Sequence, residues 1–166
     1  MSNNVMRKFF DDTPPLEGLS AEVFRTNIEA TEKFMLSLPG LQVEPVHRFA
    51  EGLYCRQLTM PANTVWMSRV HKHENYAFIM SGSCTVYSES GKETIHAPAM
   101  ITTRVGTKRI LLIHGEDCTW ITVHALPPGM GPDSKVEEIE EYLACNTLED
   151  FGKYLTAEQG KGGVTV

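Results

Sequence analysis

The spacing of hydrophobic positions changes near residue 43, and each spacing predicts a different kind of element. Ser20 is a suitable helix N-cap, and Pro39-Gly40 is a suitable helix stop. Between them a mostly apolar stripe recurs every three or four positions, as on one face of a helix, and consists of Phe24, Ile28, Thr31, Met35 and Leu38. We therefore expect one N-terminal helix, preceded by a loose polar arm over residues 1–19.

The central part of the chain lacks helical periodicity. Short runs rich in Val, Ile, Thr and aromatic residues alternate there with turn residues such as Gly82, Gly91 and Gly106. This alternation of short strands and turns indicates an antiparallel sandwich or barrel, because closing a sheet removes the exposed edges that would aggregate. Strands are expected at residues 53–60, 64–71, 75–80, 83–88, 92–97, 101–103, 109–114 and 119–125.

Helical spacing returns after Pro127-Pro128-Gly129. Asp133 or Ser134 is expected to cap a helix containing Val136, Ile139, Tyr142 and Leu143, with Glu137, Glu138, Glu140 and Glu141 on its solvated face. Thr147 and Asp150 match a capping box that opens a last short helix. The expected organisation is one domain, with an N-terminal arm and helix in 1–42, a barrel in 43–126 and a helical extension in 127–166.

The composition agrees with a single compact domain. The 166 residues are 42% hydrophobic and 22% charged. The net charge of −6 argues against general binding to nucleic acid or to a membrane surface, since both are anionic. The N-terminal residues lack the apolar core of a signal peptide, and the cysteines form no C-x-x-C pair, so we expect a cytoplasmic protein with unpaired thiols.

The densest polar cluster is Arg69-Val-His71-Lys-His73-Glu74-Asn75-Tyr76. It spans the end of one expected strand and the start of the next. Because side chains alternate along a strand, Arg69, His71 and His73 are expected on one face. Histidines at positions i and i+2 can bind one metal ion, and the competing interpretation is a polar barrel mouth without metal.

This cluster, followed by Gly82, Pro98 and a Gly-Thr turn, resembles the cupin superfamily over residues 53–124. The resemblance implies a single jelly-roll barrel of antiparallel strands. In cupins a first motif, H-x-H followed by a glutamate and a glycine, and a second motif with one further histidine normally bind Fe, Mn, Ni or Zn.

Two alignments of the first cupin motif are open. If His71 and His73 are the H-x-H pair, the spacing to the glutamate and glycine requires a deletion. If Arg69 and His71 occupy the pair positions, Asn75 stands for the glutamate and Gly82 matches without a gap. We favour the second alignment, because a deletion between paired strands disturbs their register. Thr103 then stands for the second-motif histidine, and a standard cupin metal site is not expected.

The sequence also resembles small single-domain cupin-like proteins of bacteriophages and prophages. The segments that carry this similarity are 47–65, 70–91, 97–109 and 119–125. A histidine often stands at the position of Asn75 in that group. The resemblance implies a phage-derived protein in the host cytoplasm and supplies no reaction.

Three functions compete. The first is a metal-independent barrel that binds a small polar or anionic molecule through Arg69, His71, Asn75, Tyr76 and His124, since arginine matches carboxylate and phosphate geometry. The second is an enzyme. Its metal-dependent form, an oxygenase or isomerase, would hold Fe, Zn, Ni or Mn with His71, His73 and either Glu74 or His124. Its metal-free form would use His71 as a base oriented by Glu74 or Asp117. The third is a structural or assembly protein, and a homodimer or higher homo-oligomer is expected.

Overall fold

A computed structural model of the chain describes residues 21–37 and 40–161. The expected polar arm, Ser20 and Pro39 lie outside these residues. The helices are α2 (Ala21–Leu36), α3 (Val136–Leu143) and α4 (Leu148–Lys161). The strands are β1 (Val46–Ala50), β2 (Leu53–Met60), β3 (Val65–Met67), β4 (Val70–His71), β5 (Asn75–Ser81), β6 (Ser83–Ser88), β7 (Gly91–His96), β8 (Ala99–Thr103), β9 (Ile110–Ile113), β10 (Cys118–Ala125) and β11 (Ala144–Cys145).

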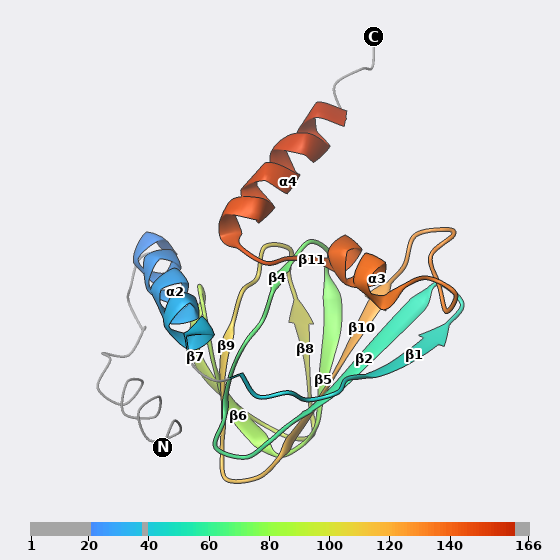
Figure 1. Cartoon of the computed structure of the whole chain (residues 1–166). Coiled ribbons are helices and arrows are strands. Elements are labelled where there is room, and N and C mark those ends of the chain that lie inside the picture. The colour runs from blue at the N-terminus through green and yellow to red at the C-terminus, as the bar shows by residue number, and fades with distance from the viewer. Residues whose placement is uncertain (1–20, 38–39, 162–166) are drawn as a thin grey trace.

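Two antiparallel sheets face each other to form the barrel (Figure 1). One sheet has the order β1-β2-β10-β5-β8, and the other has the order β3-β9-β6-β7. If β1 is set aside and the barrel strands are numbered one to eight from β2 to β10, omitting β4, these orders read 1-8-3-6 and 2-7-4-5. This arrangement is a double Greek key, so the mainly β, jelly-roll expectation is confirmed.

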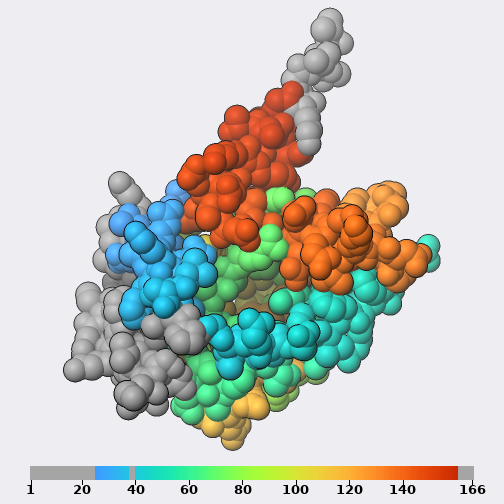
Figure 2. Space-filling model, viewed as in Figure 1, coloured from blue at the N-terminus to red at the C-terminus, as the bar shows by residue number. Residues whose placement is uncertain are grey.

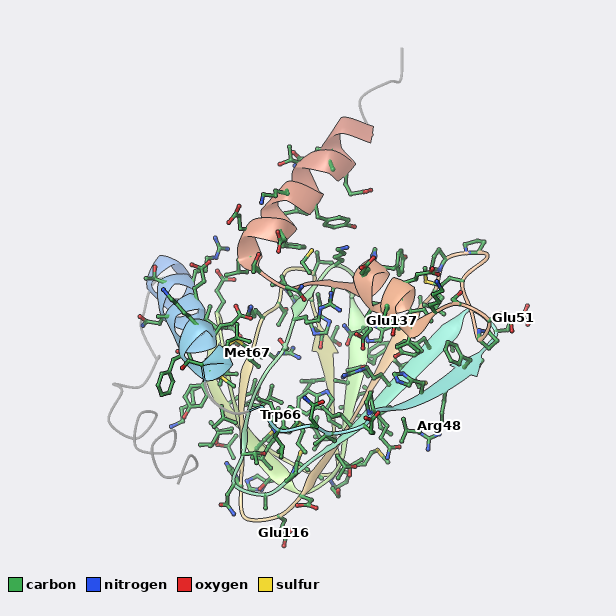
Figure 3. All side chains as sticks on the ribbon, viewed as in Figure 1. Arg48, Glu51, Trp66, Met67, Glu116 and Glu137 are labelled. Atoms are coloured by element: carbon green, nitrogen blue, oxygen red, sulfur yellow. The ribbon has the colours of Figure 1, made fainter. Side chains whose placement is uncertain are left out.

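Strand alternation places an apolar core between the sheets. On β5, Ala77 and Ile79 point inward and are 0% exposed, whereas Tyr76 and Met80 point outward and are 52% and 56% exposed. Met60, Trp120 and partly buried Trp66 belong to the same core cluster. Figure 3 shows Trp66 inside the barrel. The period-2 pattern of the sequence is therefore the pattern of burial.

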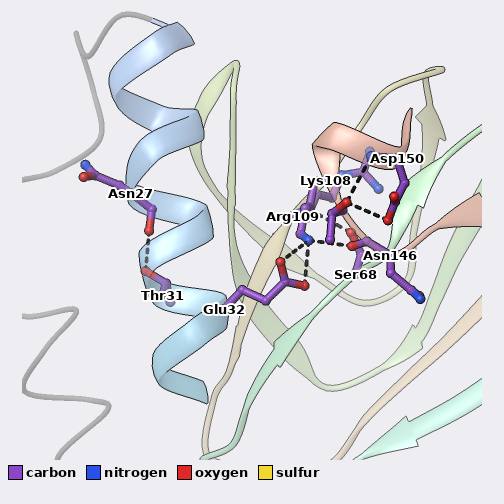
Figure 4. A network of polar contacts seen from close by, with 9 residues as sticks. Asn27, Thr31, Glu32, Ser68, Lys108, Arg109, Asn146 and Asp150 are labelled. Carbon is purple, nitrogen blue, oxygen red and sulfur yellow. Dashed lines mark hydrogen bonds and ion pairs between the residues drawn. The ribbon is translucent and has the colours of Figure 1, made fainter. Parts of the chain in front are cut away.

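Helix α2 packs outside the four-stranded sheet. Ile28 forms a buried cluster with Tyr87 of β6 and Ile110 of β9. Glu32 also reaches the barrel, where both of its carboxylate oxygens accept hydrogen bonds of 2.7 Å from Lys108 Nζ (Figure 4). Lys108 donates a further bond to the carbonyl oxygen of Asn146, so this buried ammonium joins α2 to the segment before α4.

The C-terminal part covers one end of the barrel. Helix α3 lies over that end, β11 pairs with β4, and α4 projects away from the barrel (Figure 1). Ile139 and Leu143 of α3 are buried beside Tyr54 of β2. We call this end, which also carries His71, the covered end, and the end that carries Glu116 (Figure 3) the opposite end.

Some expected boundaries were wrong. The strand expected at 64–71 is interrupted at Ser68 and Arg69, because β3 pairs with β9 whereas β4 turns to pair with β11. Strands β1 and β11 were not expected. Ser134 does not cap α3: its hydroxyl accepts a bond from the Gly131 N–H, and the N-cap residue is Lys135.

The capping box before α4 is confirmed. The Thr147 hydroxyl accepts a bond from the Asp150 N–H and donates one to the Asp150 carboxylate. The four cysteines are unpaired, as expected, and only Cys55 is partly exposed. No helix in the described part is long and apolar enough to cross a membrane.

Candidate functional site

A cavity of about 370 Å³ opens inside the barrel beneath α3. Its inner part is apolar and is lined by Leu58, Met60, Trp66, Leu111 and Trp120. Its outer part is polar and is lined by Arg56, Arg69, His71, Arg109, His124 and Glu140. Leu41, Gln42 and Val43 line it from the segment after α2, and Figure 2 shows the surface hollowed between this segment and α3.

His71 lies among the polar groups of this cavity, and its backbone is held on two sides. Its N–H donates to the carbonyl of Thr107, and its carbonyl accepts from the N–H of Gly106. Gly106 has a φ of +81°, a conformation that favours glycine in this turn. The ring position is thus fixed by the turn after β8 as well as by the pairing of β4 with Ala144 of β11.

Two side chains define the surroundings of the His71 ring. Asn75 Nδ2 lies 3.2 Å from His71 Nδ1 and donates a hydrogen bond to it, which leaves the ring proton on Nε2. The ring of His124 stacks at 6.2 Å between centroids. Two strands of different sheets, β4 and β10, therefore bring together two histidines that lie far apart in the sequence.

Both histidines are uncharged near neutral pH. Burial, followed by the electrostatic influence of His124, Arg109, Arg56 and Arg69, lowers the pKa of His71 to about 3. Burial, followed by the charges of Arg56 and His73, lowers the pKa of His124 to about 4. The permanent positive charge of the cavity consequently comes from its arginines.

Two of the three arginines share one carboxylate. Arg56 Nε lies 3.4 Å from Glu140 Oε1, and Arg69 Nη1 lies 3.6 Å from Glu140 Oε2. These ion pairs are longer than the 2.7–2.9 Å of a good charged hydrogen bond. Arg69 Nη2 also donates to the carbonyl oxygen of Ala144.

The third arginine has a different environment. Arg109 Nη1 donates to the hydroxyl of buried Thr103 at 2.8 Å. No carboxylate of the described residues lies within ion-pair distance of Arg109. Burial lowers the pKa of Arg109, and the more distant charge of Glu93 opposes this effect only in part. Its guanidinium is therefore the cavity charge with the least direct compensation.

Unsatisfied polar atoms concentrate at the same place. Within the described part of the chain, four buried side-chain nitrogen or oxygen atoms lack a hydrogen-bond partner, and they are Arg56 Nε, Arg69 Nε, Asn75 Oδ1 and His124 Nδ1. Arg56 Nε is close to Glu140 without the geometry of a hydrogen bond. Each such atom costs about 1–3 kcal/mol when left without a partner in a protein interior, so their clustering needs an explanation.

The residues expected from the sequence divide into two groups. Arg69, His71 and His124 line the cavity together, and Asn75 contacts His71. The remaining three do not line it. Tyr76 is 52% exposed on the outer face of β5, His73 stacks on Tyr142 at 4.4 Å between ring centroids, and Glu74 is exposed.

The structure adds three charged residues that sequence reasoning missed. Arg56 shares the inward face of β2 with buried Tyr54 and Met60, so alternation was a usable signal. Glu140 was expected on the solvated face of its helix, which is wrong: it borders the buried stripe of Ile139 and Leu143 and lines the cavity. Arg109 was expected only as the first residue of a strand at 109–114.

The donor set does not fit a divalent transition metal. No group of three or more His, Cys, Asp or Glu side chains in the described residues is arranged to hold a metal ion. His71 and His124 approach each other, but His73 and Glu74 do not join them. Three guanidinium groups also surround the pair, and their charge opposes a dication.

A metal-free base mechanism lacks its orienting carboxylate. His71 contacts the amide of Asn75. Glu74 is exposed, and Asp117 accepts a bond from the Ala62 N–H at the opposite end of the barrel. Neither carboxylate takes the orienting role expected from the sequence.

No protein-family model matches the chain, and no curated protein is significantly similar to it. Similar solved structures include the Clostridium difficile EutQ protein, at 15% identity and a TM-score of 0.42, with 53% of this chain and 70% of that chain covered. The Schizosaccharomyces pombe Cnp3 cupin domain matches at 17% identity and a TM-score of 0.45, with 55% and 66% covered. A cupin-2 domain protein from Shewanella frigidimarina matches at 11% identity and a TM-score of 0.41, with 58% and 92% covered. Nothing about a ligand or a reaction follows at this similarity, and the assignment as a jelly roll rests on strand order.

Proposed function

We propose that this protein is a cupin-like binding barrel that takes a small organic anion, a carboxylate or a phosphate ester, in its cavity without a transition metal. The observation that carries the proposal is the cluster of incompletely paired guanidinium groups around His71 and His124. A ligand anion would supply acceptors to Arg56 Nε and Arg69 Nε, both of which lack one.

The charge balance of the cavity wall supports an anion. Three arginines and one glutamate line it, which leaves a charge of about +2 because the two histidines are neutral. This excess occurs in a chain whose net charge is −6. A local cationic pocket in an acidic protein attracts anions while the rest of the surface repels them.

The shape of the cavity limits the ligand further. A volume of about 370 Å³ is at the lower end of the range of small-molecule sites. The apolar inner wall, with Trp66, Trp120 and Met60, suits a hydrocarbon or aromatic body. The best match is an organic acid with one anionic group and an apolar portion.

The proposal is tested by isothermal titration with benzoate, phenylacetate and phenyl phosphate, each paired with an uncharged counterpart such as benzamide. We expect at least one anion to bind and its uncharged counterpart to bind at least tenfold more weakly, because a charged hydrogen bond contributes roughly 1.5–3 kcal/mol. Equal binding of both members of every pair, or no binding of any anion, would contradict the proposal.

A matched pair of variants locates the site. Arg109→Met removes the least compensated charge of the cavity, whereas Arg48→Met removes an exposed arginine that contacts Gln57 on the outer face of the sheet. Loss of binding in the first variant only supports the cavity. Equal loss in both would place the anion elsewhere.

The phage relationship, the homo-oligomer and the cytoplasmic location belong to the same proposal and rest on the sequence. A native mass spectrum of protein purified without a metal-binding tag reports the oligomer, any metal and any bound small molecule together. Stoichiometric metal that is lost in a His71→Ala variant would instead favour the metal-dependent oxygenase or isomerase.

A further inference from the structure

Glu140 differs from the other acidic residues of α3. Glu137, Glu138 and Glu141 are exposed, whereas Glu140 is half-buried and lines the cavity. Burial of Ile139 and Leu143 fixes the orientation of α3, and the pairing of β11 with β4 anchors its C-terminal end. These contacts fix α3 so that it positions the Glu140 carboxylate in the cavity wall.

The contacts of Glu140 are incomplete. Its oxygens lie 3.4 Å from Arg56 and 3.6 Å from Arg69, and neither guanidinium Nε has a hydrogen-bond partner. A free carboxylate or phosphate can align with the planar fork of an arginine and form two short bonds. Glu140, attached to the helix, reaches both arginines without achieving this geometry.

We infer that Glu140 is an internal occupant of the anion position between Arg56 and Arg69, and that a ligand displaces it on binding. This inference rests on the proposed function and adds to it how the site is regulated and what it selects. The ligand anion takes over both guanidinium groups, and the Glu140 side chain turns toward solvent while α3 stays in place.

Displacement makes the site selective. A weakly basic or poorly shaped anion gains too little binding free energy from the two arginines to displace the Glu140 carboxylate. A planar carboxylate or a phosphate can accept hydrogen bonds from the Nε–H groups of both arginines, to which Glu140 is not hydrogen-bonded. Glu140 therefore acts as a specificity-determining residue that sets a threshold for entry.

The test compares the affinities of benzoate and phenyl phosphate for wild-type protein and three variants. Glu140→Gln removes the competing charge. Glu140→Asp keeps the charge but withdraws it by one methylene group from the arginines. Glu137→Gln removes an exposed charge from the same helix. We expect tighter binding by about tenfold in both Glu140 variants and unchanged binding in Glu137→Gln, because half-exposed ion pairs of this kind are of modest strength.

The outcomes are distinct. Tighter binding in Glu140→Gln alone, with Glu140→Asp like wild type, would mean simple charge repulsion and would overturn the inference. Weaker binding in both Glu140 variants would mean that Glu140 orients the arginines, and would also overturn it. If neither anion binds to any of the four proteins, the proposed function itself fails for these anions.

Discussion

Histidines at the two ends of the barrel differ in how completely their ring nitrogens are hydrogen-bonded. At the opposite end, His114 Nδ1 lies 2.9 Å from the Ser83 hydroxyl and His114 Nε2 lies 2.9 Å from the Thr85 hydroxyl. At the covered end, His124 Nδ1 has no partner although the residue is only 5% exposed. The same residue type is fully hydrogen-bonded at one end and incompletely bonded at the other.

Under the proposed function, the difference separates groups that hold the fold from groups that would bind a ligand. A histidine bonded at both nitrogens contributes to stability and has little capacity left for a new contact. The groups around His71 carry a cost in the free protein that a suitable ligand would remove. Replacing fully paired groups should therefore reduce stability, and replacing groups of the cavity should mainly reduce binding.

The largest effect is expected for Glu32→Ala. This change leaves the Lys108 ammonium, which is 3% exposed, without its carboxylate partner. Breaking a buried ion pair on one side costs roughly 3–5 kcal/mol, so the free energy of unfolding should fall by about 3 kcal/mol or more. Urea denaturation measures it, with exposed Glu29→Ala on the same helix as the control. A fall of less than about 1 kcal/mol would show that the pair is not structural.

Acid should weaken the covered end next. His71 and His124 have a pKa of about 3 and about 4 in the folded protein and 6.5 when unfolded. Below pH 6.5 the unfolded state binds more protons than the folded state. The free energy of unfolding therefore decreases as the pH is lowered, until each folded pKa is reached. The loss approaches about 1.4 kcal/mol per pH unit for each histidine. Denaturation of wild type and His124→Gln at pH 7, 6 and 5 measures it, and equal slopes for both proteins would refute the assignment.

His114→Leu should have a moderate effect on stability. It removes both bonds and leaves the hydroxyls of Ser83 and Thr85 to find other partners. A cost of roughly 2 kcal/mol is expected, as for other buried polar groups that lose a partner. Thermal unfolding provides the measurement. The affinity of this variant for benzoate should equal that of wild type. A reduced affinity would contradict the assignment of His114 to the fold rather than to the anion site.

Arg56→Met should have the smallest effect on stability. Its Nε already lacks a hydrogen bond, and Arg69 remains beside Glu140 after the change. The free energy of unfolding should shift by less than about 1 kcal/mol, since a half-exposed ion pair contributes about 0–1 kcal/mol. The affinity for benzoate should fall at least tenfold. A large loss of stability with unchanged affinity would reverse the roles assigned here.

The sequence predicts the barrel well because the strands follow local rules. Alternation of apolar and polar positions marks most of them, and turn glycines such as Gly82 and Gly106 separate them. The capping box of Thr147 and Asp150 is equally local. Strand β11 consists of two residues and is defined by its pairing with β4, so no local sequence pattern predicts it.

The site is less predictable because it is assembled across strands. The cluster from Arg69 to Tyr76 identified Arg69 and His71, but His73 and Tyr76 turn out of the cavity. Arg109 approaches His71 from the segment just before β9, and Glu140 approaches from a helix; such contacts depend on tertiary packing. Of the three charged residues that were missed, only Arg56 and Glu140 carried a positional signal, as an inward strand residue and as a neighbour of the buried helix stripe.

The imidazole nitrogens of the histidines provide the most direct test of the account. Their ¹⁵N resonances should be followed by NMR during a titration with benzoate. The account predicts that the signals of His71 and His124 shift as the cavity fills, while those of His114 stay unchanged. Saturable binding that moves His114 and leaves His71 and His124 unaffected would contradict it.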